Sequence, residues 1–198
     1  MSNAENVPPG EGGAASGAGG ARSLARELAR LAAAPPPGVQ VQINDHDLTQ
    51  FIAIVDGPAG TPYAGGVFRV SVSLAGWPAA PRARFLTRVF HPNVSAAGDV
   101  CVSTLARDWR PELGLRHALL ALTSLLIAPN PDSALNADAA ALLAQRYDDY
   151  ARRAKMLTEI HAQPHMLDGC GSGEAGGKRP APPPPRANKD KRRILKRL

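Results

Sequence analysis

The sequence predicts an α/β protein of the α+β class, in which one four-stranded antiparallel sheet is flanked by helices. Two observations predict this class. From about residue 39, apolar side chains recur with a period of two, as they do in strands with one buried face. On both sides of this region the apolar spacing becomes that of amphipathic helices.

The first predicted helix precedes the strands. Ser23 can cap it, and the prolines at 35–37 end it. Its apolar stripe has the spacing i, i+4, i+7: Leu24, Leu28 and Leu31. Residues 1–21 are rich in Gly and Ala without periodicity, so we expect a disordered extension there, because such a segment buries too little apolar surface.

Four strands are expected next, and the short turn clusters between them favour an antiparallel meander. The expected strands cover residues 39–44, 49–56, 67–74 and 82–90. Residues 91–114 then show little periodicity, and an irregular segment of this length is uncommon without a functional reason. An apolar helix is then expected over 115–128, and Asn136 can cap one or two helices within 137–162.

Charge separates the chain into two parts. Residues 1–177 hold fourteen Lys and Arg against sixteen Asp and Glu, whereas residues 178–198 hold nine against one. The basic pI therefore belongs to the tail, and nucleic-acid binding loses its main support for the folded part. No apolar run is long enough to span a membrane, and the N-terminus does not resemble a signal peptide.

The two cysteines, Cys101 and Cys170, have no spacing typical of a disulfide framework or a metal site. A reducing compartment is the expectation, in the cytoplasm and nucleus. His161 and His165 are separated by Pro164, and we assign no metal or other cofactor to them.

Cys101 is the residue that best fits a catalytic role. Between Val100 and Val102, a lone thiol is by itself more typical of core packing than of catalysis. No adjacent His or Lys activates it, which argues against protease-type chemistry. A thiol that only relays an acyl group from another thioester needs less activation, and the amide of Asn93 can donate to the oxyanion.

Sequence motifs around this cysteine resemble those of ubiquitin-conjugating enzymes. The matching runs are HPNVSAAGDVCVSTL, a following Trp109, LLIAPNPDSALN, and PYAGGVFRV at a strand entry. The resemblance covers about residues 22–162. It implies the fold of that family over a catalytic domain at 22–163, followed at 164–198 by a Pro/Gly linker and a basic docking tail. It also implies ubiquitin, an activating enzyme and a ligase as partners.

By this resemblance Cys101 carries ubiquitin as a thioester and loses it to a lysine amine. Asn93 supplies its amide to the oxyanion or holds the active-site loop, and sequence leaves both open. His91 and Pro92 are expected to support the site through rigid turn geometry.

The chain is most similar to the S type, which elongates ubiquitin chains with the anaphase-promoting complex during the cell cycle. Ser133 stands where many members have an Asp that orients the incoming lysine, and a hydroxyl cannot act as that carboxylate. An acid of the acceptor ubiquitin would complete the site, or Asp132 could substitute. The expected docking element is the end of the tail: Leu195, Lys196, Arg197 and Leu198.

Three alternatives remain. The chain could serve another ligase and linkage. Arg110-Pro111-Glu112 replaces the Ser-Pro-Ala that usually docks ring-type ligases, so we expect weaker ring docking and a more important tail. It could be an inactive family variant, although those variants lack the cysteine. It could bind nucleic acid or chromatin through its tail. Apolar anchors at Leu195 and Leu198 suit a protein groove better than phosphate, so nucleic acid is not the expected partner.

Overall fold

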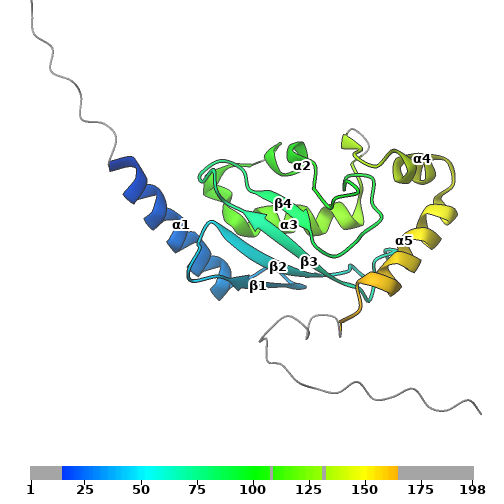
Figure 1. The fold of residues 1–198 in the computed structure, drawn as a ribbon, viewed down its shortest axis with the longest axis horizontal. Helices are drawn as coiled ribbons and strands as arrows, with labels where there is room; N and C mark the ends of the chain where they lie inside the picture. The colour runs from blue at the N-terminus through cyan, green and yellow to red at the C-terminus, as the bar shows by residue number, and fades with distance from the viewer. Residues whose placement is uncertain (1–14, 108, 131–132, 165–198) are drawn as a thin grey trace, which may run out of the picture. The chain divides into compact units, whose positions relative to one another are not determined.

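The computed structural model describes residues 15–107, 109–130 and 133–164 (Figure 1). Its strands are β1 Val39–Ile43, β2 Gln50–Asp56, β3 Val67–Ser73 and β4 Arg82–Phe85. They form one sheet in the order β1-β2-β3-β4, and each strand is antiparallel to its neighbour. The predicted meander is therefore confirmed.

Five α-helices and a 3₁₀ turn accompany the sheet in the described ranges. They are α1 Ala15–Ala33, α2 Val102–Ala106, η1 Pro111–Leu113, α3 Gly114–Ile127, α4 Ala137–Gln145 and α5 Tyr147–His161. Helix α1 lies at one end of the sheet, while α4 and α5 lie at the other (Figure 1). The helices predicted from apolar spacing are all present. None of the described helices is long and apolar enough to cross a lipid bilayer.

Two predicted boundaries were wrong. Helix α1 begins at Ala15 rather than at Ser23, so its first turns include Gly19 and Gly20, where a Cβ would meet no neighbouring atom. Strand β4 ends at Phe85 rather than at residue 90. The N–H groups of Leu86 and Thr87 both donate to the Arg69 carbonyl, at 2.8 and 3.3 Å, which ends the regular ladder.

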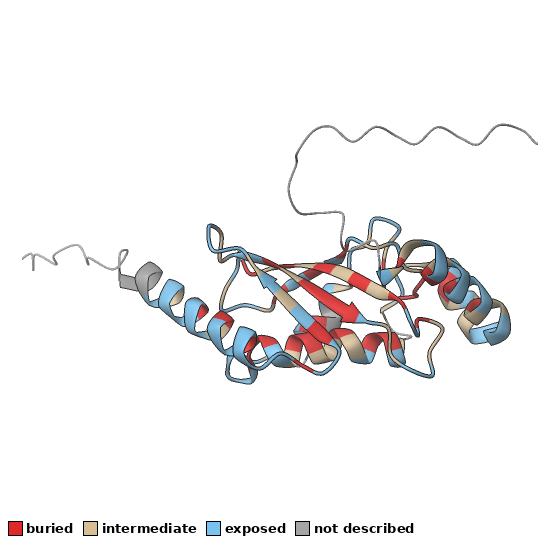
Figure 2. Cartoon of the chain, turned by 90° about the horizontal axis from the view of Figure 1, so that it is seen from below, coloured by how far each residue is buried: buried red, intermediate tan, exposed pale blue. Residues whose placement is uncertain are grey.

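The core fills the space between the inner face of the sheet and two helices. Apolar side chains of α1, of β3 and of α3 are buried together, as the red segments in Figure 2 show. The largest fully buried apolar and tyrosine side chains come from these elements and from β2, α5 and the loop before β3: Leu31, Val55, Tyr63, Phe68, Val70, Val72, Leu115, Leu119, Leu122, Leu126 and Tyr150. This packing fixes the sheet and α3 as a rigid base for the loop that carries Cys101.

Candidate active site

His91 anchors the loop before Cys101 to helix α3. Its side chain is fully buried, and its Nε2–H donates to the Leu125 carbonyl at 2.9 Å. Its Nδ1 accepts from the Asn93 N–H at 3.0 Å, so the ring is the neutral Nε2–H tautomer. Burial lowers the pKa of His91 to about 4. At neutral pH His91 is therefore uncharged, and its two ring nitrogens bind the backbone of Leu125 and of Asn93.

Pro92 ties the same loop to the start of helix α4. Its carbonyl accepts hydrogen bonds from the N–H groups of Leu135 and Asn136, at 2.8 and 2.9 Å. Asn136 then caps α4, since its side chain accepts from Ala139 N–H at 3.1 Å. The segment that enters α4 is thus fixed against the segment that precedes Cys101.

The side chain of Asn93 is fully buried and binds Asn130 and Ser133. Its Nδ2 donates to the carbonyls of Asn130 and Ser133, at 2.6 and 2.9 Å, and its Oδ1 accepts from Asn130 N–H at 2.8 Å. Both amide hydrogens are consequently engaged by backbone in this conformation.

Cys101 lies directly beside this anchored segment. Its N–H donates to the Asn93 carbonyl at 3.2 Å, and a bridge between Val94 and Val100 closes the intervening loop. The residue is half-buried, and α2 begins immediately after it. Cys101 and Asn93, separated in sequence, are therefore neighbours through their backbones.

Ser133 is the other predicted site residue that the structure describes. Its carbonyl is held by Asn93, and its Oγ accepts from Asn130 Nδ2 at 3.2 Å. Asp132 and Cys170 lie outside the described residues, as does the expected docking element at 195–198.

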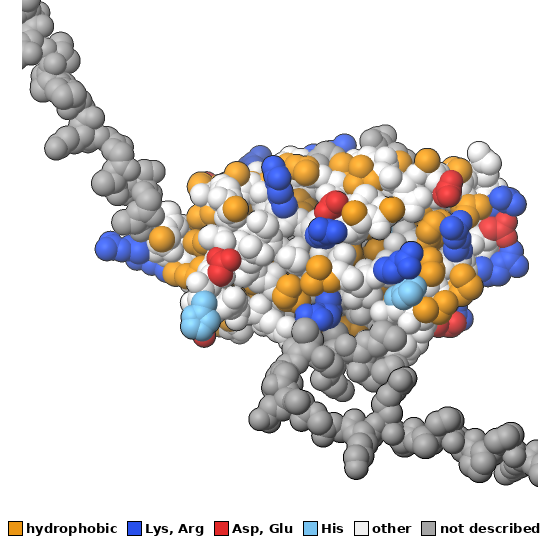
Figure 3. Space-filling view, viewed as in Figure 1, with side chains coloured by type: hydrophobic (Ala, Val, Ile, Leu, Met, Phe, Trp, Pro, Cys, Tyr) orange, Lys and Arg blue, Asp and Glu red, His pale blue; other side chains and the backbone are white. Residues whose placement is uncertain are grey.

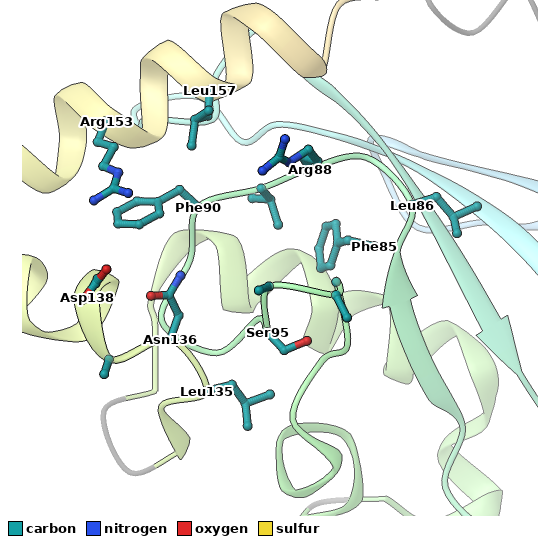
Figure 4. Close-up of a pocket in the computed structure, with 15 residues that line it drawn as sticks. Phe85, Leu86, Arg88, Phe90, Ser95, Leu135, Asn136, Asp138, Arg153 and Leu157 are labelled. Carbon is teal, nitrogen blue, oxygen red and sulfur yellow. The ribbon is translucent and has the colours of Figure 1, made fainter.

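A pocket of about 500 Å³ opens beside the active-site loop, between α4, α5 and the end of β4 (Figure 4). Cys101 is not among its lining residues. Within the described ranges, no three His, Cys, Asp or Glu side chains converge as metal ligands would. On the face shown in Figure 3, Lys and Arg are spread apart with acidic side chains between them.

Sequence reasoning missed three residues that support the site. Tyr63 and Tyr150 join their hydroxyls at 2.6 Å beneath the active-site loop, and Glu27 caps helix α3. Tyr63 lies within the strand-entry motif PYAGG, which was the available signal. Trp109 also has an unforeseen partner: its ring meets Trp77 edge-on with centroids 6.0 Å apart.

Together, the fold and the anchored cysteine loop define a ubiquitin-conjugating enzyme. The family model described as "Ubiquitin-conjugating enzyme" matches residues 23–158, and the chain belongs to this family. It is therefore a ubiquitin transferase, and the family implies ubiquitin, an activating enzyme and a ligase as its partners.

Curated relatives support the predicted resemblance to the S type. "Ubiquitin-conjugating enzyme E2 S" of Drosophila erecta is 54% identical over 157 residues, covering 78% of this chain and 74% of the relative. The protein of the same name from Drosophila grimshawi is 46% identical over 195 residues, covering 89% and 92%. A crystal structure of a putative ubiquitin conjugating enzyme from Plasmodium yoelii aligns with a TM-score of 0.66 at 28% identity, covering 73% of this chain and 96% of that chain.

Proposed function

We propose that Cys101 accepts the C-terminal carboxyl of ubiquitin as a thioester from the activating enzyme and passes it to a lysine amine. The Cys101 sulfur replaces the sulfur of the activating enzyme at the carbonyl, and the lysine nitrogen later replaces Cys101. The observation that carries this proposal is the set of three hydrogen bonds made by the Asn93 side chain. They fix Asn93, which begins the segment that ends at Cys101. Asn93 acts as loop support, since its amide hydrogens already bind backbone.

A charging assay tests this step. With activating enzyme, ATP and ubiquitin, the intact chain is expected to form an adduct that a reducing agent removes. Cys101→Ala is expected to abolish the adduct, and Cys170→Ala, the matched control, is expected to leave it. Absence of a reducible adduct on the intact chain contradicts the proposal.

We further propose that the enzyme elongates ubiquitin chains of one linkage together with the anaphase-promoting complex, in the cytoplasm and nucleus. Relatives named E2 S support this finer assignment. Ser133 supports it as well, because a hydroxyl cannot orient the attacking lysine as a carboxylate does. Acceptors that present their own acid beside the lysine then react best.

Linkage typing with ubiquitins that each retain a single lysine tests the elongation step. One lysine is expected to dominate, and equal use of all lysines contradicts the assignment. Deletion of residues 195–198 tests the docking step. The deletion is expected to abolish ligase-dependent elongation while leaving charging intact and phosphate binding nearly unchanged. Loss of nucleic-acid binding with unchanged elongation would favour the alternative role of the tail.

A further inference from the structure

Two buried tyrosines meet beneath the active-site loop. The Tyr63 hydroxyl donates to the Phe90 carbonyl at 2.8 Å, and it lies 2.6 Å from the Tyr150 hydroxyl. A carbonyl can only accept, so the single hydrogen of Tyr63 belongs to Phe90. The hydrogen between the two hydroxyls therefore comes from Tyr150. Tyr150 of α5 thus donates to the Tyr63 hydroxyl, which in turn donates to the Phe90 carbonyl.

Phe90 is the residue immediately before the anchored segment 91–93. Its ring is held as well as its carbonyl, because the Arg153 guanidinium lies 4.4 Å from the ring centroid. Figure 4 shows Arg153 reaching from α5 toward the Phe90 ring. Helix α5 thus contacts Phe90 directly through Arg153 and through the Tyr150 ring, whose centroid lies 6.0 Å from that of Phe90, and indirectly through the Tyr63 hydroxyl.

The anchors of the neighbouring residues lie on other elements. His91 is held by α3, and the side chain of Asn93 is held by Asn130 and Ser133. Phe90 is the point at which this segment is fixed to helix α5. Since the Asn93 carbonyl binds Cys101 N–H, a shift at Phe90 can reach Cys101 through three residues of backbone and one hydrogen bond.

We propose that Tyr63 and Tyr150 are positioning residues for ubiquitin transfer: their paired hydroxyls fix the Phe90 carbonyl and with it the approach to Cys101. The inference rests on the proposed thioester role of Cys101. Neither tyrosine touches the reacting atoms. They act through backbone, so their loss slows transfer from enzyme that is already charged, without preventing charging.

Removal of single hydroxyls from the full-length chain tests the proposal. Tyr63→Phe leaves the buried Phe90 carbonyl without a donor and the Tyr150 hydroxyl without an acceptor. It is expected to slow discharge of the thioester to free lysine about tenfold or more. Tyr150→Phe leaves Tyr63 bound to Phe90 and is expected to slow discharge about two- to fivefold, the effect of losing one ordinary hydrogen bond. Tyr147→Phe is the matched control, because Tyr147 packs against Tyr150 but is more than half exposed.

The readout is the discharge rate against lysine concentration, normalised to the amount of thioester. A positioning role lowers the maximal rate and leaves the half-saturating lysine concentration unchanged. The Cys101 amide resonance is expected to shift in both variants and not in Tyr147→Phe. If the variants melt earlier but discharge at the wild-type rate, the pair only stabilises the core and the proposal fails. If the wild-type chain forms no thioester, the proposed function itself fails. Should Tyr63→Phe not fold, Tyr150→Phe decides.

Discussion

The carboxylate of Glu27 on helix α1 accepts a hydrogen bond from the backbone N–H of Leu115 at 2.8 Å, across a sequence separation of 88 residues. Leu115 lies in the first turn of α3, where N–H groups lack partners within the helix. The Glu27 side chain is 14% exposed, and its charge also suits the positive end of the helix dipole. One side chain of α1 therefore caps the helix that supports His91.

Glu27→Ala is expected to destabilise the fold. The variant leaves a partly buried N–H without an acceptor and removes a favourable charge, which costs about 1–2 kcal/mol. Thermal melting should show a decrease of about 3–6 °C for a domain of this size. Glu112→Ala removes an exposed carboxylate just before the same helix and is expected to melt like the wild type. Equal melting of both variants would show that the cap contributes nothing.

Gly114 is expected to resist substitution for two separate reasons. Its φ of +72° is unfavourable for residues with a Cβ, and a Cβ there would collide with the Glu27 carboxylate. Gly114→Ala is expected to cost about 3 kcal/mol or more. In the Glu27→Ala background only the backbone strain remains, about 1–3 kcal/mol, because φ +72° with ψ 177° is adopted almost only by glycine. A double-mutant cycle by urea unfolding measures the difference, and strict additivity would exclude the collision.

The spacing of apolar residues was enough to predict the sheet and the helices, because the buried face of a strand or helix determines which residues along that segment are apolar. It could not predict where β4 ends, since that depends on two N–H groups sharing the Arg69 carbonyl. The motif around Cys101 predicted the candidate site residues. Their partners could not be predicted, because Asn93 binds residues 37 and 40 positions away and Tyr63 binds one 87 positions away. Such pairings are set by tertiary packing.

His91 is expected to make stability depend on pH. Its pKa is about 4 in the folded protein and about 6.5 when unfolded, so only the unfolded chain takes up a proton between these values. Its contribution to stability is fully present above pH 6.5 and is lost as the pH falls toward 4, by roughly 3 kcal/mol in total. The midpoint of urea unfolding, followed from pH 7 to 5, measures this slope. His91→Gln is expected to flatten it, and a slope unchanged by that substitution would assign the effect to other groups.

Asn93→Asp is expected to release Asn130 and Ser133 from their contacts with residue 93. At neutral pH the new carboxylate cannot donate, and it would face the carbonyls of Asn130 and Ser133 in a buried site. We expect faster amide exchange at Asn130 and about tenfold slower discharge of the thioester, because leaving buried carbonyls without a donor costs about 1–3 kcal/mol. Asn93→Ala should raise the exchange as well. Slower discharge with unchanged exchange would favour the oxyanion role instead.

Ser133→Asp is expected to relax acceptor selectivity. The Ser133 Oγ accepts from Asn130 Nδ2, and a carboxylate can accept from the same amide while presenting its second oxygen to a lysine. An enzyme-borne acid would remove the need for an acid on the acceptor, so single-lysine ubiquitins that the wild type neglects should become substrates. Total chain formation should persist.

The measurement is the distribution of products over the single-lysine ubiquitins, with each rate normalised to thioester. Ser133→Asn is the matched control, because an amide of similar size can bind Asn130 but cannot attract an ammonium group by charge. It is expected to keep the preference of the wild type. If Ser133→Asp also keeps a single linkage, then selectivity depends on how the acceptor docks rather than on a carboxylate missing at this position.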